Sequence, residues 1–347
     1  MFKLNKDYIN YFLFFLIVVS YFFGFFFNEN SAGAGGYKGD ITWILKNIEI
    51  FKTNNLIDAI FDEKLFGNRT PLIYIINKIF NPFFFEYEKY RYSVSLLSFL
   101  GIFIFYLGLK IKFKEVNQSQ LLLISSVILL SPYYRTSAYW ALNENYGIFF
   151  SILSLVLLGS SKNWLGKSFY FLKITLLIFS SSLCVYFDQK LIIIPLIAYL
   201  TIINYEKKLS FKINITVLYG IFSIPYLFLI YKWGGLVPPL TQLENPNSVT
   251  SLNHIKDIYL FNVGYASTII GFYIFPFIFF KEKNFLNLLK QFFLIRNNYI
   301  IIFIGLIYIL VLNFFYNFED YTIKNYWIGL GYIHKFSKLI FSNIIFQ

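Results

Sequence analysis

Residues 10–27 read NYFLFFLIVVSYFFGFFF and contain no charged side chain. A helix needs about 20 predominantly apolar residues to cross the hydrocarbon core of a bilayer. Lys3 and Lys6 come before this run, an arrangement that is also typical of a secretory signal peptide. The run is too long for a signal peptide, however, and no small-residue cleavage site precedes the polar segment that follows. The sequence therefore predicts an uncleaved first membrane span.

Similar apolar runs recur along the chain of 347 residues, of which 57% are hydrophobic and 14% are charged. Soluble domains contain about a quarter charged residues. We therefore expect an all-α, polytopic bundle of about 9–10 transmembrane helices, forming one integral membrane domain. The expected spans lie near residues 8–27, 90–109, 120–130, 146–158, 169–187, 191–204, 213–231, 258–280, 299–316 and, interrupted by two lysines, 326–346.

Basic residues gather in the short loops, for example at Lys110, Lys112 and Lys114, and they account for much of the net charge of +12. Lys and Arg collect in the cytoplasmic loops of membrane proteins. The pattern places the amino terminus inside and residues 28–89 outside. It also explains the positive net charge without a nucleic-acid partner. Most acidic residues then lie outside, either on a solvated loop surface or in a site that carries carboxylates.

The counts of cysteine and histidine exclude two kinds of site. Cys184 is the only cysteine, so the chain forms no internal disulfide. His254 and His334 are the only histidines, too few for a histidine-rich metal site. The sequence contains no glycine-rich phosphate loop, nucleophile elbow or cluster of metal ligands. It therefore predicts no bound cofactor, and nothing in it supports a divalent metal ion.

The first outer segment, residues 28–89, is much longer than a usual loop. Asp40 begins a stretch whose apolar residues recur with helical spacing up to Phe51, which predicts an amphipathic juxtamembrane helix. Asp40 is either the cap of this helix or a functional carboxylate beside a membrane-facing platform. Residues 71–85 are apolar but short, and they predict an interfacial or re-entrant helix. Arg69, just before them, suits a phosphate or a lipid headgroup.

The order of these features resembles that of the GT-C superfamily of membrane glycosyltransferases. The resemblance covers residues 1–205 and leaves 206–347 as further spans. It departs from the family pattern at Arg69-Thr70, where members have a histidine before the proline, and in lacking a large soluble outer domain. The matching motifs are Gly35 to Asp40, Pro71-Leu-Ile-Tyr74, Ser131-Pro132, Trp140-Ala-Leu-Asn-Glu144-Asn and Asp188-Gln-Lys190 followed by Pro195.

The resemblance implies an inverting transfer of a sugar from a polyprenyl-phosphate donor to a glycan or lipid acceptor. The resemblance also implies that this reaction takes place at the outer face of the cytoplasmic membrane. Asp40 is the expected base and Glu144 the second candidate, although Glu144 also suits the dipole of a helix N-terminus. Arg69, Arg135 and Lys190 are the candidates for the donor phosphate. Arg135 has the alternative role of anchoring the membrane interface, and Lys190 that of pairing with Asp188.

We further expect Asp40, Glu144 and Lys190 to face one cavity on the outer side. The later outer loop, residues 232–257, is expected to cover this cavity. His254 in this loop either contacts substrate or, as is more common for a single loop histidine, has no role at the site. Tyr37 is a further expected substrate contact. Three alternatives stay open. They are a transporter or flippase of lipid-linked glycans, a polymerase or ligase of lipid-linked polysaccharide, and a non-catalytic membrane scaffold.

Overall fold

The computed structural model describes residues 6–30, 40–160 and 170–244, together with positions 299, 303, 305–307 and 310. The chain divides into two units, Met1–Ser251 and Leu252–Gln347, and the elements below belong to the first. The spans expected at 258–280 and 326–346, and most of the span at 299–316, lie outside the described residues.

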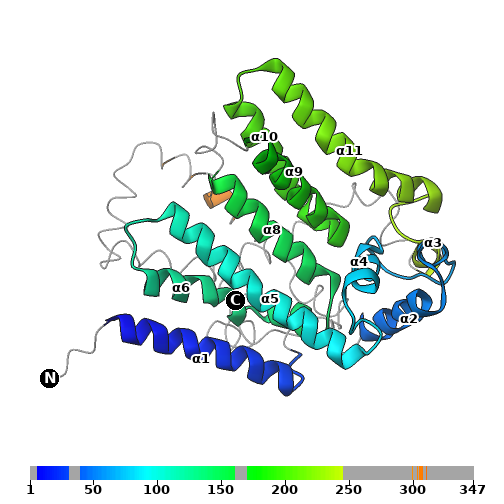
Figure 1. Cartoon of the computed structure of the whole chain (residues 1–347), viewed down its shortest axis with the longest axis horizontal. Coiled ribbons are helices and arrows are strands. Elements are labelled where there is room, and N and C mark those ends of the chain that lie inside the picture. Colours follow the sequence, from blue (N-terminus) through cyan, green and yellow to red (C-terminus); the bar gives the residue numbers. More distant parts are fainter. Residues whose placement is uncertain are drawn as a thin grey trace. The chain divides into compact units, whose positions relative to one another are not determined.

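The prediction of an all-α chain is confirmed for the residues that the structure describes (Figure 1). Two short 3-10 helices, η1 and η3, also occur, η1 between α6 and α7 and η3 between α9 and α10. In chain order the elements are α1 (Lys6–Phe26), α2 (Asp40–Thr53), α3 (Leu56–Ile60), α4 (Leu72–Phe80), α5 (Tyr87–Lys112), α6 (Gln118–Ser126), η1 (Val127–Leu130), α7 (Pro132–Tyr139), α8 (Asn143–Ser160), α9 (Tyr170–Phe187), η3 (Gln189–Ile192), α10 (Ile193–Tyr205), α11 (Leu209–Trp233) and α12 (Pro239–Glu244).

Four of these helices, α1, α5, α9 and α11, are long and apolar enough to cross a membrane. Helices α7 and α8 meet the same criterion only as a pair, and the pair is bent by 119°. The segments Gln118–Leu130 and Gln189–Tyr205 are apolar but shorter than a full crossing. The spans expected near 120–130 and 191–204 therefore fall short, because each is a brief 3-10 turn joined to a short α-helix.

The long helices form a bundle in which α5 packs against α8, α8 against α9, and α9 against α10 and α11 (Figure 1). Helix α1 packs against α6. In α1 and α11 only 11% and 6% of the apolar window is buried, against 50% in α9. Extended apolar surface of this kind is typical of helices that face lipid, since soluble monomers rarely expose large apolar patches.

Helices α2, α3 and α4 gather at one end of the bundle, where α1 ends and α5 begins (Figure 1). The lysine-bearing end of α5 and the start of α11 lie at the opposite end. Helix α4 has nine residues and rises about 1.5 Å per residue, so it is too short to cross a bilayer. This length agrees with the interfacial or re-entrant helix predicted for residues 71–85.

The amphipathic helix predicted from Asp40 is present as α2, but its apolar face has a different neighbour from the one expected. The buried side chains of α2 include Ile44, Ile48 and Phe51, and the helix packs against α4. Leu45 alone of the large apolar residues on this helix stays more than a third exposed. The face expected to form a membrane-facing platform is therefore covered by protein, because α4 folds back over it.

Candidate functional site

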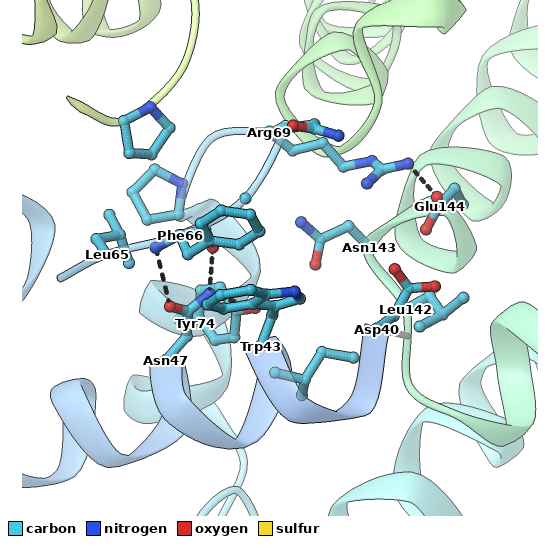
Figure 2. Close-up of a pocket in the computed structure, with 15 residues that line it drawn as sticks. Asp40, Trp43, Asn47, Leu65, Phe66, Arg69, Tyr74, Leu142, Asn143 and Glu144 are labelled. Carbon is cyan, nitrogen blue, oxygen red and sulfur yellow. Dashed lines mark hydrogen bonds and ion pairs between the residues drawn. The ribbon is translucent and has the colours of Figure 1, made fainter. Parts of the chain in front are cut away.

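A pocket at the α2–α4 end of the bundle brings together stretches that are far apart in the sequence (Figure 2). Its volume is about 90 Å³, which is small beside the roughly 300–1,000 Å³ of sites that enclose a whole ligand. A cavity of this volume has room for only part of a ligand of that size. It is lined by Asp40, Trp43, Ile44 and Asn47 of α2, by Leu65 to Arg69 and Pro71, by Tyr74 of α4, by Leu142 to Glu144, and by Pro238.

Arg69 reaches the pocket from the loop between α3 and α4, whose neighbouring residues are tied to other parts of the chain. The Thr70 hydroxyl donates a hydrogen bond of 2.7 Å to the carbonyl oxygen of Tyr186. The backbone N–H of Gly67 donates to Thr241 Oγ1 at 2.9 Å. Because both flanks are held, the guanidinium extends across the pocket toward α8 (Figure 2).

The guanidinium of Arg69 forms an ion pair with the carboxylate of Glu144, through Nη2 and Oε1. The Nε atom of Arg69 is buried and has no hydrogen-bond partner among the described residues. Buried polar groups are almost always satisfied by protein or ordered water. The Arg69 Nε–H therefore marks a place where an oxygen atom of a ligand or of water completes the site.

Glu144 lies in the first turn of α8, just after the bend that separates this helix from α7. Ala141 adopts a φ of 54° in this junction, a left-handed conformation that is uncommon outside glycine. The backbone N–H of Leu142 donates to the carbonyl oxygen of Ser137 at 2.9 Å. The reversal turns Asn143 and Glu144 into the pocket (Figure 2), at a helix N-terminus that favours a carboxylate.

Asp40 is the first residue of α2 and lies on the opposite wall of the pocket from Arg69. Its carboxylate points into the pocket, below Asn143 and Glu144 (Figure 2). A carboxylate at this position also interacts favourably with the N-terminal dipole of the helix. The two interpretations of Asp40, helix start and pocket carboxylate, are therefore compatible in this structure.

The floor of the pocket is an aromatic pair that a buried amide holds in place. Trp43 and Phe66 stack with ring centroids 3.7 Å apart and an interplanar angle of 22°. Asn47, which is 1% exposed, donates to the carbonyl oxygen of Phe66 at 2.6 Å and to the Tyr74 hydroxyl at 3.0 Å. Burial raises the pKa of Tyr74 to about 12, so its phenol stays protonated at neutral pH. The floor is rigid and carries no net charge.

Arg135 lies outside the pocket. Its guanidinium pairs with Glu29 at 3.0 Å, donates to the hydroxyl of Tyr139 at 2.9 Å and bonds the carbonyl oxygen of Ser20. These contacts attach the end of α1 to α7. The prediction that Arg135 joins Arg69 at a donor phosphate is therefore wrong, because the Arg135 guanidinium makes these contacts instead of lining the pocket.

Lys190 does not line the pocket either. It lies in η3, where its side chain is exposed and its backbone N–H donates to Asp188 Oδ1 at 3.1 Å. This cap fixes the turn with Lys190 on the exposed side. Of the three residues expected to face one cavity, the two carboxylates, Asp40 and Glu144, share it and the lysine does not.

Two expected substrate contacts, Tyr37 and His254, lie outside the described residues. Of the later outer loop, Pro238 forms part of the pocket wall, and residues 245–257 lie outside the described residues. Within residues 6–30, 40–160 and 170–244, no group of three or more His, Cys, Asp or Glu side chains is placed to hold a metal ion.

Among the pocket residues that sequence reasoning did not single out are Trp43, Asn47 and Asn143. Trp43 and Asn47 follow Asp40 at spacings of three and seven, which place all three on one face of a helix. That signal was present in the sequence. Asn143 had no signal beyond its position next to Glu144, because the turn that directs it into the pocket depends on tertiary contacts.

Comparison of the chain with protein-family models, with curated proteins and with solved structures gives no match.

Proposed function

We propose that this chain transfers a sugar from a polyprenyl-phosphate donor to a glycan or lipid acceptor at the outer face of the cytoplasmic membrane. The observation that carries the proposal is the convergence of Asp40 with the Arg69–Glu144 ion pair in one pocket. This pocket lies at the end of helices that are long and apolar enough to cross a membrane. A donor anchored in the bilayer presents its sugar phosphate at such a surface. The GT-C resemblance of the sequence points to the same chemistry.

In the proposed reaction Asp40 is the general base. Its carboxylate takes the proton of the acceptor hydroxyl while that oxygen forms a bond to the anomeric carbon of the donor sugar. The bond from the anomeric carbon to the phosphate oxygen breaks on the opposite face of the sugar. Polyprenyl phosphate leaves with the electron pair of that bond. One displacement of this kind inverts the anomeric configuration.

Arg69 is the cation that compensates the charge developing on the departing phosphate. Its planar guanidinium matches a phosphate with two parallel hydrogen bonds, and its buried Nε–H has no partner among the described residues. Glu144 already accepts a hydrogen bond from the same guanidinium. We therefore give Glu144 the role of a positioning residue that directs Arg69, and Asp40 the role of base.

The test replaces Asp40 by Asn in the native host, in a strain that lacks the chromosomal gene. The matched control is Glu49→Gln, which removes a carboxylate of the same helix whose side chain is 62% exposed and does not line the pocket. We expect Asp40→Asn to lose one sugar from the surface glycan and to accumulate the lipid-linked donor. Glu49→Gln should match the wild type, with equal amounts of all three proteins in the membrane.

Two results would contradict the proposal at different levels. A normal surface glycan in Asp40→Asn cells would remove Asp40 from the mechanism. A normal glycan in cells without the gene would remove the glycosyltransferase function itself. Mass spectrometry of the glycan and of the lipid-linked sugars distinguishes these results.

A further inference from the structure

Two polar groups in the pocket take no part in the proposed chemistry. They are the indole N–H of Trp43 on α2 and the side-chain amide of Asn143 at the start of α8. Both point into the space between Asp40 and Arg69 (Figure 2). Within the part of the chain that the structure describes, neither group is hydrogen-bonded to another residue.

The indole of Trp43 is held in a fixed position. The indole of Trp43 is stacked on Phe66, and Lys46 Nζ lies 4.2 Å from the indole centroid. The edge that carries the N–H is therefore the part of the ring that faces the pocket (Figure 2). Asn143 is the first residue of α8, which places its backbone at the pocket. Groups that are ordered before binding lose little entropy when a ligand arrives.

The chemistry of these groups suits hydroxyl groups. An indole N–H only donates, an amide both donates and accepts, and the carboxylate of Asp40 only accepts. A hydroxyl group can satisfy each of these, because it donates one hydrogen bond and accepts others. Neither Trp43 nor Asn143 carries charge, and Asp40, whose carboxylate points into the pocket, lies on the pocket wall with them. A ligand carboxylate at this place would be repelled by Asp40.

We infer that Trp43 and Asn143 form a subsite that hydrogen-bonds the hydroxyl groups of the transferred sugar, and that this sugar is neutral. The two residues determine which sugar is accepted, while Asp40 and Arg69 act on the bond that is exchanged. The inference rests on the proposed function in that it takes the ligand of the pocket to be the donor sugar.

The test measures binding in the absence of turnover, on purified Asp40→Asn protein in lipid nanodiscs. The ligands are short-chain prenyl-phosphate hexoses, their single-deoxy analogues and the matching hexuronate, and calorimetry gives each Kd. Both variants are made in the Asp40→Asn protein, which is their parent. Trp43→Phe removes the indole N–H and keeps a smaller aromatic ring against Phe66, and Asn143→Leu removes the amide at similar volume. Glu49→Gln is the control, and the wild-type protein is measured in parallel.

We expect each variant to weaken binding of its preferred hexose by about 3- to 10-fold, the effect of one neutral hydrogen bond. One deoxy analogue lacks the hydroxyl that the substituted side chain would bond. Its Kd should be the same for the variant and for the Asp40→Asn parent. In the wild-type protein the hexuronate should bind at least about tenfold more weakly than the hexose, because the Asp40 carboxylate repels it. This difference should shrink in Asp40→Asn, which lacks that charge. Glu49→Gln should leave every Kd unchanged.

Equal Kd values in the parent and in both variants would overturn the subsite, and so would the absence of binding to both the wild type and Asp40→Asn. If the wild-type protein bound the hexuronate more tightly than the hexose, the assignment of a neutral sugar would be overturned. A separate transfer assay on the wild type keeps the two proposals apart. Binding that depends on the sugar hydroxyls, without transfer, would exclude the proposed reaction and leave the subsite. Transfer by the wild type, with Kd values unchanged in both variants, would exclude the subsite and leave the reaction.

Discussion

The guanidinium of Arg69 and the carboxylate of Glu144 are separated by 75 positions in the chain and form an ion pair across the pocket (Figure 2). The arginine belongs to the loop between α3 and α4, and the glutamate belongs to a long helix of the bundle. Their side chains are 21% and 30% exposed, so solvent reduces the net stability that the pair contributes. Its main effect is to direct the guanidinium across the pocket.

Replacing Arg69 by Lys keeps the charge and removes the planar fork. If the fork holds the donor phosphate, the KM for a polyprenyl-phosphate donor should rise by about tenfold or more. Glu144→Gln keeps an acceptor for the guanidinium and should raise KM less. Lys64→Gln, an exposed change outside the pocket, serves as the control. Steady-state kinetics that give an unchanged KM for Arg69→Lys would exclude phosphate contact by this residue.

The proposed orientation predicts opposite accessibility for the two ends of the bundle. Lys64 follows α3, at the end where the pocket lies, and Lys110 lies in the last turn of α5; both are exposed. A membrane-impermeant maleimide should label Lys64→Cys in intact cells and Lys110→Cys only after permeabilisation. The native Cys184 is fully buried, which keeps background labelling low. The reverse pattern would place the pocket in the cytoplasm.

Gly24 allows α1 to approach α7 closely. A Cβ atom at this position would lie 2.4 Å from Glu29 Oε2 and 2.6 Å from Arg135 Nη2. Gly24→Ala should therefore displace that ion pair. Since the atoms in the way are side-chain ends that can shift, the cost should lie near the lower end of about 1–3 kcal/mol. Gly159→Ala in α8 is the matched control, because a Cβ there meets nothing within 4 Å and alanine favours a helix by up to about 1 kcal/mol. Thermal unfolding in detergent compares the two, and equal melting temperatures would contradict the close approach.

Ala141 holds the bend between α7 and α8 with a φ of 54°. Glycine adopts this conformation without a steric penalty, so Ala141→Gly should keep or raise the melting temperature. Ala141→Val should lower it by several degrees, because a branched side chain is strained at positive φ and the site is 1% exposed. A melting temperature for Ala141→Val equal to that of wild type would show that the junction can relax.

Thr241 joins the segment after α11 to the loop that carries Arg69, across 174 positions of sequence. Its hydroxyl accepts from the N–H of Gly67 at 2.9 Å and donates to the carbonyl oxygen of the same residue at 3.2 Å. Thr241→Val removes both bonds at constant volume, which leaves that N–H unsatisfied. Hydrogen exchange at residues 65–69 should accelerate in Thr241→Val and stay near wild type in Thr241→Ser. Equal protection in all three proteins would show that other contacts fix the loop.

Local features of the sequence were enough to predict the elements that surround the site. The uncharged run at 10–27 became α1, the helical spacing after Asp40 became α2, and the short apolar stretch from Pro71 became α4. Each prediction depended only on the period and length of an apolar pattern. The apolar stretches near 120–130 and 191–204 lie in the segments Gln118–Leu130 and Gln189–Tyr205, which are shorter than the four long helices. Hydrophobicity by itself does not show where a helix breaks.

Which cation meets the carboxylates was decided by tertiary structure. Arg69, Arg135 and Lys190 were equivalent candidates in the sequence, and only Arg69 lines the pocket. Its position depends on contacts from Thr70 and Gly67 to distant parts of the chain, and these leave no local signature. The sequence determined the helices and placed Asp40 at the start of one of them. The reversal at Ala141 and the long-range bonds determined what that carboxylate faces, because a pocket depends on the directions of side chains from separate elements.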